Sequence, residues 1–308
     1  MTDYPTVAGP DPAADATLAA LLEQLQERHR HSVRTILVYG SCLRGGDIYD
    51  GLLDLYVLVD SYRQAYPSRL TAVANWLLPP NVFYAEQRGD TRTLRAKVTV
   101  ISQTDFHRGC SKAWFESYLW GRFAQPTYVI FARDAQAQAD AQVALLVAAQ
   151  TLLRRALPCL PATGSLTELW EQSLDLSYGT ELRTERGGRA GELARASAAF
   201  YQQITRHMGD LGLGLTVDNQ GCYHTNIAAP KRRLAALAWA CRRVQGKLLS
   251  IARLVKGLFT FEGGLDYIAW KLERHSGESI VIPDKVRRRP LIHLWGFFWS
   301  LYRRGIFK

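Results

Sequence analysis

The sequence predicts an α/β domain with a mixed sheet, followed by a mostly helical second domain and a C-terminal amphipathic helix. Two observations lead to this prediction. Before residue 135, short apolar runs alternate with polar loops, which is typical of buried strands. After residue 135, apolar residues recur at helical spacing. The expected parts are a disordered tail at 1–15, the α/β domain at 16–134, the helical domain at 135–284 and a basic tail at 285–308.

The α/β domain is expected to open with a helix near Asp15, because the leucines at 18, 21, 22 and 25 fall on one helical face. A polar, glycine-rich loop at 44–47 separates the first two expected strands. The apolar runs predict strands at 35–39, 52–59, 81–85, 96–102 and 127–131.

The second domain carries two helix-start signals. Asp134 stands where an N-cap is expected before a long helical pattern at 135–157. Residues 165–168 read Ser-Leu-Thr-Glu, a capping box that opens another helix. Two further helices are expected at 191–207 and 230–254, and a loop at 209–226.

Composition limits the cell compartment. No run of about 20 apolar residues is present, so no helix should span a bilayer. Residues 1–14 are rich in Pro, Ala and Asp, contain no Arg and resemble neither a signal peptide nor a transit peptide. The five cysteines are scattered without a CxxC pair, which argues against zinc or a disulfide framework and favours a reducing cytoplasm.

The first expected strand ends at Gly40-Ser41, and Asp54 follows thirteen residues after Ser41 inside another apolar strand. Glycine allows a phosphate to approach the backbone closely, and the amides and the Ser41 hydroxyl can cradle a triphosphate. A strand carboxylate can hold Mg²⁺ against those phosphates. An ordinary turn, and a salt bridge for Asp54, remain the structural alternatives.

This arrangement is that of the nucleotidyltransferase superfamily, with one departure. Such enzymes usually carry two carboxylates flanking one residue, and the second place here is Tyr56, a poor Mg²⁺ ligand. The residues that could supply the missing carboxylate are Asp47, Asp50, Glu86 and Glu181.

Several motifs occur in a fixed order over residues 35–275: 38–41 (Val-Tyr-Gly-Ser), 53–54 (Leu-Asp), 81–84 (Asn-Val-Phe-Tyr), 97–102 (Lys-Val-Thr-Val-Ile-Ser), 118–126 (Tyr-Leu-Trp-Gly-Arg-Phe-Ala-Gln-Pro), 176–178 (Leu-Ser-Tyr), Glu181, Arg183, 256–260 (Lys-Gly-Leu-Phe-Thr) and 270–272 (Trp-Lys-Leu). In the order and spacing of these motifs the chain resembles the mitochondrial-type phosphatidate cytidylyltransferases. These enzymes are also called translocator-assembly-maintenance CDP-diacylglycerol synthases. In that family the position of Tyr56 is not acidic either. The chain departs from the family at Val98-Thr99, at Glu181 and in residues 209–226.

The resemblance implies a nucleotidyltransferase fold for residues 16–134 and a magnesium-dependent reaction of CTP with phosphatidate, which yields CDP-diacylglycerol and pyrophosphate. The phosphomonoester of phosphatidate is already anionic, so the enzyme need only align two phosphates and screen their repulsion. Because no transit sequence is recognisable, we expect a bacterial member of the family, cytoplasmic and bound peripherally to the inner face of the cell membrane. Its implied partners are CTP, phosphatidate and an anionic membrane surface.

The candidate site residues follow from the same comparison. The catalytic set is Asp54, Lys97 and Arg122, and the metal set is Asp54 and Glu181. The nucleotide-binding set is Tyr39, Gly40, Ser41, Lys97, Ser177, Tyr178 and Arg183. Each has a structural alternative: Lys97 could face solvent, Arg122 could pair with Glu116, Arg183 could lie on a charged helix face, and Ser177-Tyr178 could be helix packing.

The C-terminal tail carries seven of the ten excess positive charges and no acidic residue after Asp284. Its apolar run at 291–302 is too short to span a bilayer but suits a helix lying in the headgroup layer. Residues expected to bind the membrane are Arg287, Arg288, Arg289, Trp295, Phe298, Trp299, Arg303 and Arg304. A core helix is the alternative, and nucleic acid fits less well because the stretch between the basic clusters is apolar.

Two other functions stay open. A nucleotidyltransferase acting on a small molecule or a protein hydroxyl would need a general base, because a neutral hydroxyl is a poor nucleophile. A catalytically decayed enzyme could serve as a lipid-surface adaptor, and Tyr56 is the residue that favours this reading.

Overall fold

The structure is a computed structural model of the chain. It describes residues 4–181, 188–208, 212, 214–260 and 282–288, together with the single residues 273, 280, 293, 296, 299 and 303.

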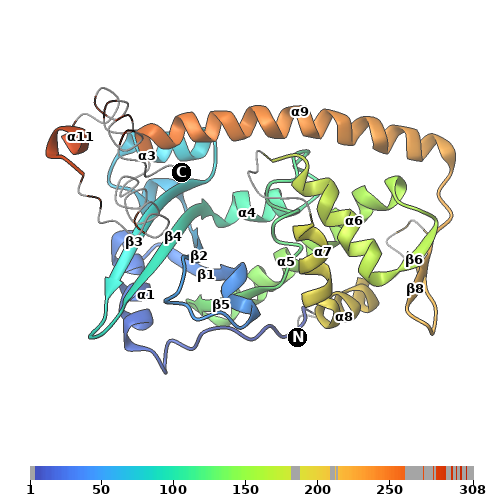
Figure 1. The fold of residues 1–308 in the computed structure, drawn as a ribbon, viewed down its shortest axis with the longest axis horizontal. Helices are drawn as coiled ribbons and strands as arrows, with labels where there is room; N and C mark the ends of the chain where they lie inside the picture. Colours follow the sequence, from blue (N-terminus) through green and yellow to red (C-terminus); the bar gives the residue numbers. More distant parts are fainter. Residues whose placement is uncertain are drawn as a thin grey trace.

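A mixed five-stranded sheet forms the first half of the molecule (Figure 1). Its strand order is β3-β4-β2-β1-β5. Strands β2 and β4 are parallel, whereas the other neighbouring pairs are antiparallel. The strands are β1 (Val33–Tyr39), β2 (Leu53–Val59), β3 (Asn81–Arg88), β4 (Thr93–Ser102) and β5 (Thr127–Ala132). The predicted mixed sheet and its five strands are thereby confirmed.

Helices flank this sheet. The first begins where the sequence predicts, because the Asp15 side chain accepts a hydrogen bond from the Leu18 amide at 3.0 Å and so caps the helix. Three short helices between the strands were not predicted from the sequence. The helical segments here are α1 (Ala16–Arg28), η1 (Ser41–Arg44), α2 (Tyr62–Ala65), α3 (Arg69–Leu77) and α4 (Gln103–Cys110).

The second half is mostly helical. Asp134 caps α5 (Ala135–Ala156), and Ser165 with Glu168 forms the predicted capping box of α6 (Leu166–Tyr178). The single helix expected at 191–207 is in fact two, α7 (Arg189–Ala196) and α8 (Ala198–Met208). The remaining elements are η2 (Leu157–Cys159), α9 (Ala229–Thr260) and α11 (Asp284–Arg288).

The prediction of a loop at 209–226 was wrong in part. This segment contains β7 (Thr216–Val217) and β8 (Cys222–His224), which pair with β6 (Thr163–Ser165) in a three-stranded sheet of order β6-β8-β7. Strands this short carry too few residues for a period of two to be visible in the sequence.

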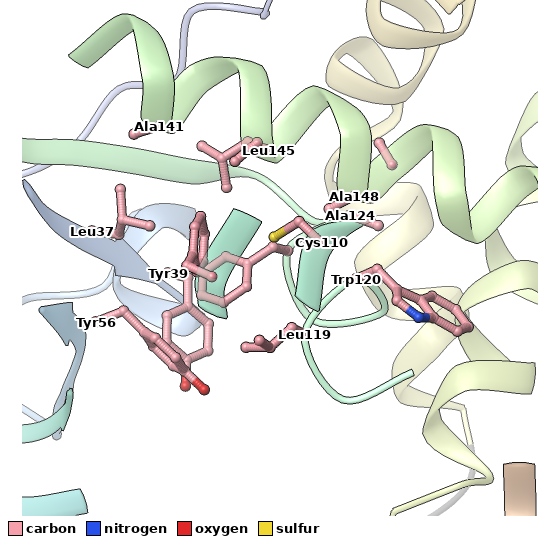
Figure 2. Packing of buried hydrophobic residues seen from close by; sticks show 14 of the residues in the cluster. Leu37, Tyr39, Tyr56, Cys110, Leu119, Trp120, Ala124, Ala141, Leu145 and Ala148 are labelled. Carbon is pink, nitrogen blue, oxygen red and sulfur yellow. The ribbon is translucent and has the colours of Figure 1, made fainter. Parts of the chain in front are cut away.

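The apolar core joins both halves. Helix α5 packs on β1 and β5 and also on α6, so one cluster of buried side chains runs through the sheet and the helices. Figure 2 shows Leu37, Tyr39 and Tyr56 beneath Leu145 and Ala148 of α5, with Trp120 farther along. The division of the chain into domains at residue 135 stays a prediction.

Helix α9 runs along the whole upper side of the molecule in Figure 1, over the second half and then to α3. Its Trp239 Nε1 donates to the Arg155 carbonyl at 2.8 Å, and its Lys256 Nζ donates to the Pro80 carbonyl at 2.7 Å. Within the described ranges, no helix is both long enough and apolar enough to cross a membrane.

Candidate active site

The corner after β1 brings the strand carboxylate beside a glycine. Tyr39 pairs with Asp54 in the β1–β2 ladder, and the chain turns at Gly40 with φ +97° and ψ −151°. A Cβ atom built on Gly40 would lie 3.3 Å from Asp54 Oδ2. The structure therefore holds the Gly40-Ser41 corner and Asp54 together, as the sequence predicts.

Lys97 reaches the same place from the neighbouring parallel strand. It is the register partner of Asp54 in the β2–β4 ladder, and its Nζ lies 3.9 Å from Asp54 Oδ1. About a third of each side chain is exposed, so the pair is screened by water and contributes little to stability. Lys97 lines the cavity beside Asp54 and does not simply point away into solvent.

Arg122 is held by two partners. Its Nη1 donates to Tyr39 Oη at 3.0 Å, and its Nη2 donates to Glu181 Oε2 at 3.1 Å. Only 12% of the Arg122 side chain and 12% of the Glu181 side chain is exposed. The alternative pairing of Arg122 with Glu116 is wrong, because Glu116 pairs with Arg253 of α9.

The protonation states in this cluster follow from burial and charge. Burial lowers the pKa of Arg122, but Tyr39 and Glu181 raise it, and the net result is a pKa well above its ordinary value. Burial raises the pKa of the Tyr39 phenol. Arg122 is therefore a permanent cation, and Tyr39 is neutral at physiological pH.

These residues surround one cavity of about 460 Å³ between the sheet and α7. This volume is within the range of small-molecule sites. The lining contains the predicted Tyr39, Gly40, Ser41, Asp54, Lys97, Arg122, Tyr178 and Glu181. It also contains four polar residues that were not among the predicted site residues, Arg44, Gln125, Arg189 and Glu192. Four cations beside three carboxylates suit an anionic ligand that carries its own metal ion.

Not every predicted residue reaches the cavity. Ser177 is fully buried and packs against Gly121, so its structural alternative, helix packing, describes it better than nucleotide binding. Arg183 lies outside the described residues.

The tail is described only in part. Arg287 and Arg288 lie in α11, and Trp299 and Arg303 are exposed, with Trp299 at 64%. Arg289, Trp295, Phe298 and Arg304 are outside the described residues.

The residues suit a magnesium ion that arrives with a nucleotide. Among the described residues, no group of three or more His, Cys, Asp or Glu side chains could hold a metal ion alone. Mg²⁺ on a nucleotide, however, needs only one or two protein carboxylates besides the phosphates. Asp54 lines the cavity and fits that requirement.

The contacts in the structure distinguish the four candidates for a second metal-binding carboxylate. Asp47 and Asp50 pair with Arg92, and Glu86 accepts a hydrogen bond from Tyr84. Of the four candidates only Glu181 lines the described cavity. Tyr56, the position where a second carboxylate was expected from the sequence, is buried, and its hydroxyl donates to Tyr118 Oη at 3.3 Å.

Comparisons with known proteins give little further information. No protein-family model matches the chain, and no curated protein matches it. Among solved structures, the crystal structure of a nucleotidyltransferase-like protein from Exiguobacterium sibiricum 255-15 aligns with 92% of this chain and 92% of its own. Its sequence identity to the chain is 11%, and the TM-score is 0.25. A similarity this weak says nothing about substrate.

Proposed function

We propose that the chain is a nucleotidyltransferase that moves a nucleoside monophosphate from a nucleoside triphosphate onto an anionic acceptor. The observation that carries the proposal is the meeting of the Gly40-Ser41 corner with Asp54, Lys97 and Arg122 around one cavity. A glycine corner beside a carboxylate and two fixed cations fits a triphosphate with its metal ion.

Each residue has a separate task. The backbone at Gly40 and the Ser41 hydroxyl would bind phosphate oxygens, because no Cβ atom blocks their approach. Lys97 and Arg122 would screen the repulsion between the two reacting phosphates. Asp54, with Glu181 as the second candidate, would hold Mg²⁺, which when bound neutralises phosphate charge and aligns the triphosphate.

The reaction balances without a proton acceptor when the acceptor is a phosphate. An acceptor oxygen forms a bond to the α-phosphorus, the bond from the α-phosphorus to the bridging oxygen breaks, and pyrophosphate leaves. Tyr39 would make a poor base because burial raises its pKa, and Glu181 is paired with Arg122. These features favour an acceptor that is already ionised.

The finer assignment, CTP as donor and phosphatidate as acceptor, rests on the sequence resemblance. Phosphatidate meets the requirement for an ionised acceptor, since its phosphomonoester is charged at neutral pH. A lipid acceptor also gives the basic tail at 285–308 a task at an anionic membrane surface, and the described Trp299 and Arg303 are exposed as that task requires.

A hydroxyl acceptor is the second candidate, and Glu192 is the observation that favours it. This carboxylate lines the cavity from α7 and could act as a general base. With a hydroxyl acceptor, Glu192→Gln should abolish transfer. With phosphatidate, the same substitution should leave the rate largely intact.

The test supplies labelled CTP, Mg²⁺ and phosphatidate vesicles, and measures labelled CDP-lipid. Asp54→Asn should lower the rate by about a hundredfold or more, because it removes a metal ligand. Asp60→Asn is the matched control, since Asp60 directly follows the far end of the same strand and pairs with Arg133. Label appearing on another acceptor, with no CDP-lipid, would reject phosphatidate.

A separate measurement distinguishes the enzyme from a decayed adaptor. Binding of CTP that depends on Mg²⁺ and is lost in Asp54→Ala supports the enzyme. CTP binding that is independent of Mg²⁺ and unchanged in Asp54→Ala, together with no nucleotidyl transfer, supports the adaptor.

A further inference from the structure

The side of α9 that faces the protein body is unusually polar. Arg242 Nε donates to the Phe115 carbonyl at 2.8 Å, and Arg253 Nε donates to the Pro79 carbonyl at 3.1 Å. Trp239 and Lys256 also donate to carbonyls of the body. The helix is thus attached through basic and indole donors more than through an apolar stripe.

The apolar stripe lies on the opposite side. At about 100° per residue, alternating steps of three and four keep side chains on one face of a helix. Six apolar residues follow these steps, and between 50% and 69% of each is exposed: Leu234, Leu237, Val244, Leu248, Ile251 and Val255. We call this set the α9 stripe. Its centre lies roughly opposite Trp239, Arg242 and Arg253.

Helix α3, near the C-terminal end of α9, also exposes apolar side chains. Arg253 and Lys256 donate to carbonyls of residues 78–80, directly after α3, and Figure 1 shows α3 beside the C-terminal end of α9. Leu70, Trp76 and Leu77 of α3 are each at least 66% exposed. An exposed apolar surface of the extent of the α9 stripe marks an interaction site.

Charge decides what the surface binds. Between residues 229 and 260 the sequence has eight basic residues and no acidic one. Four of the basic side chains are exposed on α9, namely Lys231, Arg233, Arg243 and Lys247. Two copies of such a helix would bring like charges together, whereas an anionic lipid surface would be complementary.

We infer that the α9 stripe docks the protein on an anionic lipid bilayer. Its apolar side chains would enter the boundary between headgroups and acyl chains, and the four exposed cations would meet lipid phosphates. This docking surface goes beyond the proposed function, because it is separate from the basic tail and would serve whatever reaction the cavity carries out.

The test uses Cys241, which is exposed and continues the spacing of the stripe. The full-length protein is treated with a water-soluble maleimide, and the labelling rate of each cysteine is followed by peptide mass spectrometry. Vesicles of phosphatidylcholine with phosphatidylglycerol should slow labelling of Cys241 by about tenfold or more, and pure phosphatidylcholine should not. Cys222, on the small sheet, is the internal control.

Substitutions give a second measurement. Val244→Glu with Leu248→Glu should weaken sedimentation with anionic vesicles by about tenfold. Val143→Glu should leave sedimentation unchanged, because Val143 is similarly exposed but lies on α5. The double variant should still bind CTP with Mg²⁺, so loss of docking and failure of the proposed function are distinguishable.

Two results would overturn the inference. In the first, Cys241 stays as reactive with anionic vesicles as without them while the protein sediments, so that another part of the chain holds the membrane. In the second, Cys241 becomes protected without vesicles as protein concentration rises, and the double variant abolishes this protection, so that a second copy covers the stripe.

Discussion

Replacing Gly40 by alanine tests the corner on which the proposed nucleotide site depends. Gly40 has φ +97° and ψ −151°, a conformation that only glycine adopts without strain. Its missing side chain also leaves room for the Asp54 carboxylate, 3.3 Å from where a Cβ would lie. The substitution therefore acts on both the backbone and the carboxylate.

The two effects have different sizes. Forcing an alanine into this region costs roughly 1–3 kcal/mol of stability. The contact with Asp54 Oδ2 requires the carboxylate to shift by a few tenths of an ångström, which is enough to spoil the geometry of a bound metal ion. We expect Gly40→Ala to unfold at a lower urea concentration, with a free energy of unfolding about 2 kcal/mol smaller. Its affinity for CTP with Mg²⁺ should fall by about tenfold or more.

Gly46→Ala is the matched control from the same loop. A Cβ on Gly46 would meet the Ser41 carbonyl oxygen at 3.6 Å, an ordinary contact. Urea unfolding and calorimetric titration of both variants with CTP and Mg²⁺ give the comparison. The reasoning fails if Gly40→Ala matches the wild type in both measurements, or if Gly46→Ala is equally damaged.

Three further substitutions test the surroundings of the cavity. Arg122→Met should lower the free energy of unfolding by about 3 kcal/mol, because it removes the guanidinium that pairs with the buried Glu181 carboxylate, and adding Glu181→Gln should restore part of the loss. Ser177→Ala should leave the Kd for CTP unchanged, since Ser177 packs on Gly121; a weaker Kd would restore its predicted nucleotide role. Burial lowers the pKa of Lys256 from 10.5 to about 8, so the unfolded chain binds more protons between those pH values and Lys256 contributes more stability as pH rises. Relative to Lys256→Met, urea unfolding of the wild type should gain about 1 kcal/mol from pH 8 to 10, after allowance for solvent screening, and a flat difference would refute the shift.

The sheet could be predicted from the sequence because its signals are local. Each of the five strands is a short apolar run between polar loops, and residues 16–28 and 135–156 show helical spacing with a capping aspartate before them. The helices α2, α3 and α4 were missed because they are short. Leu70, Trp76 and Leu77 face outward from α3, so its apolar residues do not mark a buried face.

Part of the site could be predicted for the same reason. Gly40-Ser41 directly follows β1, whose Tyr39 pairs with Asp54 of β2, so the register of neighbouring strands puts them together without knowledge of the tertiary fold. Arg189 and Glu192 reach the cavity only because α7 packs beside it, and nothing in their local sequence distinguishes them from a solvated charged helix. The pairing of Arg122 with Glu181 could not be predicted either, because the two residues are 59 positions apart in the sequence.

In helix α9 the apolar face is the exposed face, which the sequence pattern alone does not predict. An amphipathic pattern ordinarily predicts that the apolar face packs on the core. Here the packed face consists of donors that bind backbone carbonyls, such as Arg242 and Arg253, and the apolar face is exposed. The periodicity was visible, but only the tertiary structure reveals which face is inside.

The motif at 118–126 has a physical explanation in the way it fixes Arg122. Two guanidinium groups lie over the Tyr118 ring, with Arg122 Cζ 4.7 Å and Arg253 Cζ 4.1 Å from the ring centroid. Each cation also has its own carboxylate, Glu181 for Arg122 and Glu116 for Arg253. Two buried ion pairs thus share one aromatic ring, which links α9 to the cavity wall. Arg122 is therefore held on several sides before any ligand binds, and the proposed role of stabilising negative charge without reorganisation requires such a fixed cation.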